Sequence, residues 1–143
     1  MTALALNTTD RPSAAVTSAT AGRVEGTPRR WLRLEAAAAF AGGVAIYGAV
    51  GGNWLFLLPL LFLPDLSMAG YLAGPRIGAM TYNIAHTWVT GLVVLGAGIW
   101  LASVPLELVG AVLVAHVGMD RLMGYGLKYP TSFGDTHLGR IGR

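Results

Sequence analysis

The chain has 143 residues, enough for one compact domain, and a net charge of +3. Hydrophobic residues make up 54% of it and charged residues only 12%, about half the charged share of an ordinary soluble domain. The absence of cysteine excludes disulfides, thiolate metal ligands and a cysteine nucleophile. The basic residues form no stripe interleaved with aromatic residues, so composition predicts an integral membrane protein and no nucleic-acid partner.

The N-terminal part, residues 1–30, is rich in Ala, Thr and Ser and shows no helical or strand periodicity. We expect it to be a disordered cytoplasmic tail. The run from Arg29 to Arg33, followed by an apolar stretch, resembles a twin-arginine export signal. We favour a juxtamembrane anchor, because several further apolar segments follow it.

Four apolar segments follow, and each has about 17 to 27 residues where about 20 are needed to cross a bilayer core. They cover about residues 34–50, 54–73, 76–102 and 105–124. Pro59 and Pro64 predict a kinked or broken second helix. The predicted fold is all-α: a four-helix transmembrane bundle over residues 31–143, ending in a short ordered C-terminal loop. A soluble bundle would need polar faces that the first and third segments lack.

Charge predicts the orientation of this bundle. With four crossings, all 10 Lys and Arg residues lie on one side of the membrane. The opposite connections, Gly51–Asn53 and Ser103–Pro105, contain none. The positive-inside rule therefore places both termini in the cytoplasm and the protein in the plasma membrane as a multi-pass protein. Its expected partners are membrane lipids, with a homo-oligomer or a membrane partner also open.

Three ionisable residues lie near one depth in this arrangement. At about 1.5 Å per residue, Asp65, His86 and His116 are each about 15–17 Å from the surface at which their segment enters. A charge at that depth costs about 3 kcal/mol, so such groups usually face the bundle interior and pair. Two interpretations stay open: a functional polar site, and a hydrogen-bonded clamp between helices with neutral histidines.

Asp120 lies four residues after His116 and shares its helical face. It can pair with Arg76 or orient His116 by accepting a ring N–H. Three chemistries fit the four residues Asp65, His86, His116 and Asp120. Asp65 and the two histidines suit a divalent metal with Asp120 behind them. A metal-free His–Asp acid–base pair could act on a lipid-soluble substrate, and a proton or small-solute path is equally compatible.

Further polar residues are candidates for binding: Arg76, Tyr82, Asn83, Arg121, Lys128, Asp135 and His137. Arg76, Arg121 and Lys128 are expected near the cytoplasmic mouth. Tyr82 and Asn83 share the helical face of His86. Asp135 and His137 either cap the mouth, contribute ligands, or belong to an ordered surface loop.

Two stretches, LPDLSMAGYLAGPRIGAMTYNIAHTW and AHVGMDRLMGYGLKYPTSFGDTHLGRIGR, resemble a bacterial family of small integral membrane proteins, domain-of-unknown-function family 4260. The P-D-L-S-M, G-P-R-x-G, Y-N-x-x-H, A-H-x-G-x-D-R and G-Y-G-L-K-Y-P…D-T-H-L-G-R-I blocks match in order over about residues 31–143. The resemblance implies four membrane helices and no assigned activity. The pattern residues map onto Asp65, Arg76, Tyr82, Asn83, His86, His116, Asp120, Arg121, Lys128, Asp135 and His137.

The sequence leaves open whether the protein is an enzyme. One hypothesis is a buried polar site near the bilayer midplane, open to the cytoplasm, that acts on a small lipophilic substrate or binds a divalent metal. The other is a non-enzymatic structural or partner-binding subunit, whose first segment offers Gly42, Gly43 and Gly48 for helix packing. Side-chain tips of Asp65, His86 and His116 more than about 10 Å apart would exclude a shared site.

Overall fold

The computed structural model describes residue 24 and residues 26–141. These residues form five α-helices, one 3-10 helix and a two-stranded antiparallel hairpin, which confirms the all-α class. The elements are α2 (Gly26–Ala49), α3 (Trp54–Leu61), η1 (Leu63–Ala73), α4 (Pro75–Ala85), α5 (Trp88–Trp100), α6 (Val104–Met123), β1 (Asp135–Thr136) and β2 (Gly139–Arg140). Most of the expected disordered tail lies outside the described residues.

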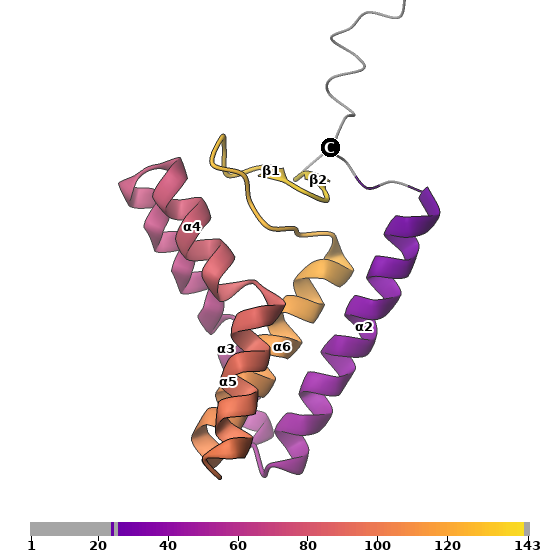
Figure 1. Cartoon of the computed structure of the whole chain (residues 1–143), viewed down its shortest axis with the longest axis vertical. Coiled ribbons are helices and arrows are strands. Elements are labelled where there is room, and N and C mark those ends of the chain that lie inside the picture. The colour runs from indigo at the N-terminus through magenta and orange to yellow at the C-terminus, as the bar shows by residue number, and fades with distance from the viewer. Residues whose placement is uncertain (1–23, 25, 142–143) are drawn as a thin grey trace, which may run out of the picture.

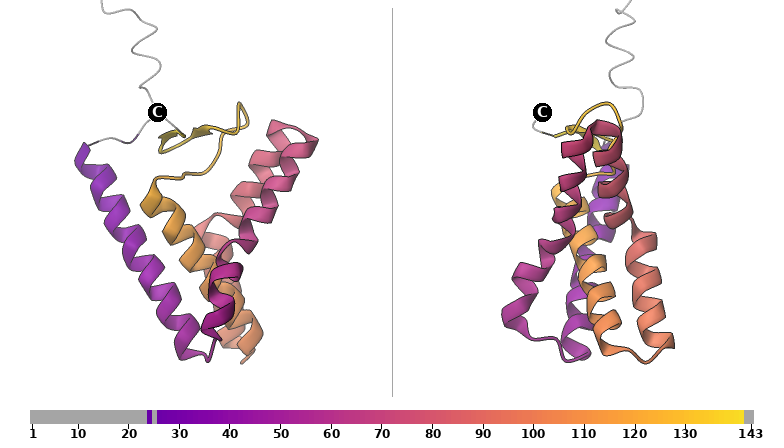
Figure 2. Two further views of the ribbon diagram at one scale, coloured as in Figure 1. Left: turned by 180° about the vertical axis from the view of Figure 1, so that it is seen from behind. Right: turned by 90° about the vertical axis from the view of Figure 1, so that its left-hand side faces the viewer.

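The chain runs back and forth between two ends of the bundle (Figure 1). α2 leads away from the hairpin end, α3 and η1 return to it, α4 and α5 lead away again, and α6 returns. α6 packs against both α2 and α5, while η1 packs against α4. The left view in Figure 2 shows that η1 and α4 diverge from α2 towards the hairpin end. The hairpin lies across that end.

The first helix begins earlier than expected. α2 starts at Gly26 rather than near residue 34, so residues 26–30 are helical and not part of the tail. Pro28 lies within the first turn, where a missing N–H costs no hydrogen bond. The arginines that follow are good helix formers. The basic run from Arg29 therefore lies inside the N-terminal part of α2 and does not mark the point where the helix begins.

Both middle segments are interrupted. The second changes from α3 to η1 at Phe62, near Pro64, as the prolines predicted. The third was expected to be one helix over residues 76–102, and this prediction is wrong. His86 and Thr87 separate α4 from α5, and the two helices are bent by 41°.

The break in the third segment contains no proline or glycine. It is stabilised by side chains, which form hydrogen bonds to the backbone groups that the helix no longer pairs. The carbonyl of Ile84 accepts a hydrogen bond from the Thr90 hydroxyl. The carbonyl of His86 accepts one from Arg121 Nη2 at 3.2 Å. Backbone groups at a helix end need such partners, and here they come from α5 and from the distant α6.

Close approach of α2 and α6 depends on small residues. A Cβ atom on Gly43 would lie 2.7 Å from the backbone nitrogen of Ala115, and one on Gly118 would lie 2.5 Å from that of Phe40. A Cβ atom on Gly42, next to Gly43, would have no neighbouring atom within 4 Å. Of the glycines singled out for packing, Gly43 therefore contacts α6, whereas Gly42 does not.

Length and composition support fewer membrane spans than the four expected. Within residues 26–141, one continuous stretch, Trp54–Ala73, is long and apolar enough to cross a membrane. The bent pair Pro75–Ala85 and Trp88–Trp100 makes a second if it counts as one span. α2 and α6 do not pass the same criteria. The structure by itself therefore supports one or two spans.

Candidate metal centre

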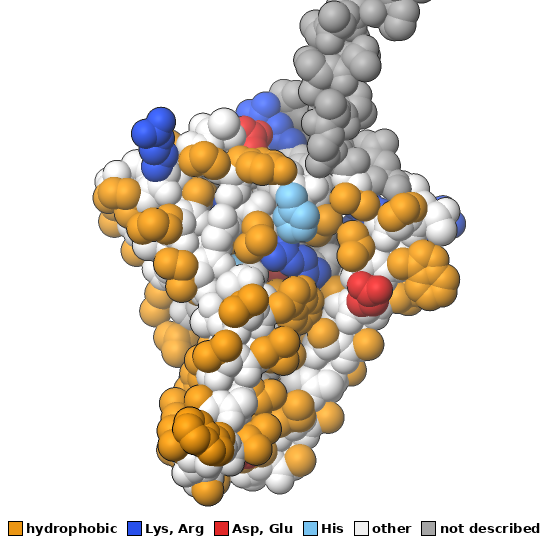
Figure 3. Space-filling model, viewed as in Figure 1, with side chains coloured by type: hydrophobic (Ala, Val, Ile, Leu, Met, Phe, Trp, Pro, Cys, Tyr) orange, Lys and Arg blue, Asp and Glu red, His pale blue; other side chains and the backbone are white. Residues whose placement is uncertain are grey.

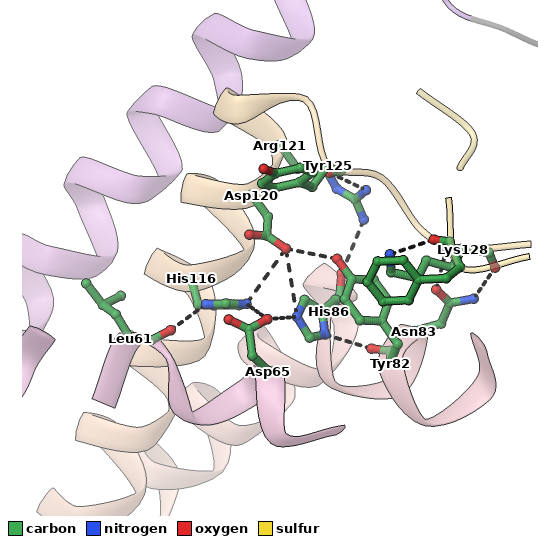
Figure 4. Close-up of polar contacts among 11 residues, drawn as sticks. Leu61, Asp65, Tyr82, Asn83, His86, His116, Asp120, Arg121, Tyr125 and Lys128 are labelled. Atoms are coloured by element: carbon green, nitrogen blue, oxygen red, sulfur yellow. Dashed lines mark hydrogen bonds and ion pairs between the residues drawn. The ribbon is translucent and has the colours of Figure 1, made fainter. Parts of the chain in front are cut away.

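Three residues predicted to lie at one depth converge in the interior of the bundle (Figure 4). Asp65 lies in the first turn of η1, His86 caps the C-terminus of α4, and His116 lies on α6. Each offers one ligand atom, and these atoms all lie within 4.8 Å of one another. The expected convergence is confirmed, and the two helix interruptions supply two of the three side chains.

The change from α3 to η1 positions His116. In η1 the Asp65 N–H donates to the Phe62 carbonyl at 3.2 Å, which is a 3-10 bond, and so leaves the Leu61 carbonyl free. His116 Nδ1 bonds to that carbonyl. His86 Nδ1 similarly bonds to the Tyr82 carbonyl at 2.8 Å.

These two bonds determine which ring nitrogen faces the cluster. A carbonyl can only accept, so both imidazoles carry a proton on Nδ1. In the neutral ring, Nε2 then presents a lone pair. Figure 4 shows both Nε2 atoms directed towards the carboxylates of Asp65 and Asp120. Both histidines are buried, with exposed fractions of 1% for His86 and 0% for His116.

The Nε2 atoms lie close to the carboxylate oxygens, and one of the four pairs is at the long end of hydrogen-bond distance. His86 Nε2 lies 3.3 Å from Asp65 Oδ1 and 3.8 Å from Asp120 Oδ2. His116 Nε2 lies 3.7 Å and 3.8 Å from the same atoms and has no hydrogen-bond partner. Ligands about 2.0–2.1 Å from a tetrahedral zinc ion lie about 3.4 Å apart. The 3.3 Å pair matches this spacing, and the three pairs at 3.7–3.8 Å are slightly longer.

Asp120 adds a fourth group to the cluster by a route that the sequence did not predict. The Tyr82 hydroxyl donates to Asp120 Oδ2 at 2.9 Å. Arg76 is exposed at the start of α4, and among the described residues it forms no ion pair with Asp120. Asp120 also does not accept the Nδ1 proton of His116, since that proton goes to Leu61. The described residues therefore do not support the pair with Arg76, whereas an orienting role of Asp120 towards His116 stays a prediction, since Asp120 Oδ2 lies 3.8 Å from His116 Nε2.

A pocket of about 390 Å³ adjoins the cluster, and we call it the site pocket. Asp65 and Asp120 line it together with Lys128. Much of its remaining wall is apolar: Phe62, Met68, Met119, Met123, Phe133 and Ile141. This volume and this mixture of an apolar wall with a few polar groups are typical of small-molecule sites.

Lys128 places a buried ammonium in the site pocket. Its exposed fraction is 4%, and burial lowers its pKa. The ammonium donates to the Phe133 carbonyl at 2.9 Å and lies 3.7 Å from the centre of the Phe133 ring. The face of the Tyr82 ring is 4.7 Å away on another side. The carbonyl and the two rings contact the ammonium, and the nearby carboxylates of Asp120 and Asp65 also favour its charged form.

Asn83 fastens the C-terminal segment, residues 124–141, to α4. Its Nδ2 donates to the Lys128 carbonyl at 2.9 Å, and the Lys128 N–H donates to its Oδ1 at 2.7 Å. The side-chain amide thus pairs with the backbone of Lys128 as a neighbouring strand would. The C-terminal segment contributes Lys128, Phe133 and Ile141 to the wall of the site pocket, and we call it the cover of this pocket. Asn83 holds the cover in place and is not itself part of the cluster.

Asp135 and His137 lie in this C-terminal segment, away from the cluster. Asp135 accepts from the Thr131 hydroxyl at 2.8 Å, and hydrogen bonds lower its pKa. His137 Nδ1 accepts from the Leu127 N–H at 2.9 Å. Burial, together with the nearby charge of Arg121, lowers the pKa of His137. Of the open alternatives for these two residues, the geometry matches the ordered loop.

Sequence reasoning did not identify the main-chain acceptors at Leu61 and Tyr82, which orient the histidines. Pro64 is a signal for the first, because a proline frees carbonyls in the preceding turn. The second has no local signal. Sequence reasoning also did not identify the apolar wall of the site pocket, because in the sequence its residues resemble ordinary membrane-helix and loop residues.

The chain can also be compared with known protein families, curated proteins and solved structures. A family model described as "Domain of unknown function (DUF4260)" matches residues 29–141. No curated protein and no solved structure matches the chain.

Proposed function

The chain belongs to the DUF4260 family, and we propose that it is a multi-pass membrane protein with a divalent transition metal at its centre. His86, His116 and Asp65 are the ligands, Asp120 is the nearest additional carboxylate, and the substrate is a small lipophilic molecule in the site pocket. One observation carries the proposal: two buried Nε2 lone pairs and carboxylate oxygens face each other across 3.3–3.8 Å.

The surface supports placement in a membrane. Large apolar side chains are widely exposed, for example Leu72 at 94%, Trp100 at 87% and Leu55 at 78%. Water-soluble monomers rarely expose large contiguous apolar patches. On the face seen in Figure 3, Lys and Arg lie towards the hairpin end, while the opposite half is largely apolar. With basic residues at that end, the positive-inside rule places it in the cytoplasm.

The donor set indicates the class of metal. Two imidazoles and a carboxylate suit Zn²⁺ or Fe²⁺, and the absence of cysteine disfavours soft ions such as Cu⁺. Three protein ligands leave a position open for a water or a substrate oxygen, which is typical of catalytic sites. Lys128, in the same pocket, is placed to bind a substrate oxygen that carries negative charge.

The geometry disfavours a purely structural clamp. A clamp stabilises a bundle when its polar atoms are bonded to each other. His86 Nε2 and Asp65 Oδ1 are within reach of such a bond at 3.3 Å, but the other three pairs, at 3.7–3.8 Å, are too far apart for one. His116 Nε2 would then remain buried and unsatisfied, which costs about 1–3 kcal/mol. A bound cation would satisfy both histidines and the carboxylates together.

Metal content tests the proposal directly. We expect the full chain, purified in detergent without chelator, to contain stoichiometric Zn²⁺ or Fe²⁺ by elemental analysis. His86→Gln and His116→Gln should each weaken metal affinity at least about 100-fold, because loss of an outer partner alone costs 10–100-fold. His137→Gln is the matched control and should retain the metal, because His137 lies outside the cluster.

Thermal unfolding provides the second measurement. A chelator should lower the melting temperature of the wild type and of His137→Gln, and leave His86→Gln and His116→Gln unchanged. A metal-free wild type whose melting temperature does not respond to added Zn²⁺, Fe²⁺ or Mn²⁺ would refute the metal centre. The clamp would then be favoured if both cluster variants melt lower than the control.

A further inference from the structure

A second pocket, of about 380 Å³, lies between α2, α5 and the C-terminal part of α6. It shares no lining residue with the site pocket. Its lining includes Arg29 and Arg33 from α2 and Arg121 from α6, and we call it the arginine groove. The proposed metal centre does not use it.

Three guanidinium groups gather at this groove, and few carboxylates lie near them in the part of the chain that the structure describes. A Cβ atom on Gly124 would lie 3.2 Å from Arg33 Nη2 and 3.4 Å from Arg29 Nη2, so both tips reach the same point beside the end of α6. Glu35 is the one acidic residue in the lining. Within residues 26–141, no ion pair joins these arginines to a carboxylate. Like charges so placed favour a bound anion.

The α6 C-terminus accounts for part of this arrangement. Its carbonyl groups attract cations, and Arg121 donates to the carbonyls of Tyr125 and His86, each at 3.2 Å. Arg121 is thereby committed to the protein. The α2 arginines have no comparable hydrogen bond to α6 among the described residues, and their Nη2 atoms remain the groups available to an anion.

Apart from Glu35 and His137, the rest of the groove is lined by apolar residues and Gly124. Leu32, Ala36 and Ala39 of α2 face Leu92 of α5 and Val114 of α6. The groove thus combines a cationic end with a hydrocarbon-like wall. The cationic end lies at the hairpin end of the bundle, at the level where exposed Trp31 and Tyr125 would meet a membrane interface. An anionic headgroup joined to an acyl chain has the complementary chemistry.

We propose that the arginine groove binds an anionic phospholipid of the adjacent leaflet. Arg29 and Arg33 bind its phosphate, and an acyl chain lies against Ala36, Ala39 and Leu92. This inference rests on the membrane placement proposed above and is independent of the metal. Arg121 links the groove to the metal centre, since it also holds the carbonyl of His86.

The test uses the full chain in nanodiscs of phosphatidylcholine with or without phosphatidylglycerol. Native mass spectrometry should show retained phosphatidylglycerol, and the melting temperature should rise when this lipid is present. Arg29→Gln with Arg33→Gln should weaken retention about tenfold or more, because both guanidinium groups that bind the phosphate are lost. Ala39→Leu, which narrows the groove without changing charge, should also weaken it.

The matched control is Arg30→Gln with Arg76→Gln. Both arginines are exposed and outside the groove, so the same charge is removed with little expected effect. Equal losses in the two double variants would reduce the effect to general surface attraction and overturn the proposal. Competition by free glycerol phosphate, with no effect of Ala39→Leu, would indicate a soluble anion and overturn it too. Unchanged metal content in every variant separates this result from the metal test.

Discussion

Single residues determine the chemistry of the cluster through the main chain. The carbonyls of Leu61 and Tyr82 take the Nδ1 protons of the two histidines and leave Nε2 to face the carboxylates. Tyr82 contributes a second time, since its hydroxyl holds Asp120. One tyrosine thus orients an imidazole through its backbone and a carboxylate through its side chain. Orientation by such outer partners is typical of metal sites.

At this scale, Asn83 offers a prediction about the cover of the site pocket. Asn83→Ala removes both bonds to Lys128 and should lower the free energy of unfolding by about 1–3 kcal/mol. Asn83→Asp keeps the acceptor and loses the donor, so its effect on the backbone pair should be partial. Detergent melting measures stability, and limited proteolysis after Lys128 measures release of the cover.

Metal content distinguishes positioning from ligation for Asn83. Both variants should retain the metal, because the amide lies outside the cluster. If Asn83→Ala loses metal while its melting temperature is unchanged, the residue acts on the site directly and the assignment above is wrong.

At the scale of elements, function depends on where helices stop. A continuous α-helix through Leu61 and Asp65 would occupy the Leu61 carbonyl with a backbone N–H, so His116 would lose its acceptor. The break after α4 similarly places His86 at a helix end. In the proposed membrane placement, such irregular backbone is tolerated where protein buries it.

Packing of α2 on α6 can be tested with two neighbouring glycines. Gly43→Ala would place a Cβ against the backbone of Ala115, so it should destabilise the protein by about 1–3 kcal/mol. Gly42→Ala meets nothing and should be neutral or stabilising by up to about 1 kcal/mol, because alanine favours helix. The measurement is thermal unfolding in detergent. Equal effects of the two substitutions would contradict the close α2–α6 contact.

At the scale of the whole molecule, the described helices bring the cationic part of the arginine groove to one end. The hairpin, the start of α2 and the end of α6 lie together there (Figure 1). The turns at the opposite end, residues 50–53 and 101–103, contain no basic residue. This asymmetry supports the proposed orientation, with the hairpin end in the cytoplasm.

Labelling of single cysteines tests the orientation, since the natural chain has none. Thr27 and Leu101 are exposed at opposite ends of the bundle. In intact cells a membrane-impermeant maleimide should label Leu101→Cys, whereas Thr27→Cys should react only after permeabilisation. Labelling of both positions from the same side would rule out an odd number of crossings between them. Reversed labelling would mean the opposite orientation.

Much of the fold follows from the sequence. Apolar segments, their order and the basic end could be read directly, because burial in lipid or protein requires long apolar runs. The shared depth of Asp65, His86 and His116 could also be predicted, since position along a helix is proportional to residue number. The break at His86 could not, because its hydrogen bonds come from Thr90 and Arg121, and the latter lies on another helix.

The sequence by itself thus determined the helical class and the level at which three ionisable groups lie. Only the tertiary structure decided that Asp120 joins them through Tyr82, that Nε2 faces inward, and that Arg29 and Arg33 meet beside α6. The physical reason is geometric. Local sequence specifies height along a helix, whereas rotation about the helix and distance between helices are set by packing of residues far apart in the chain.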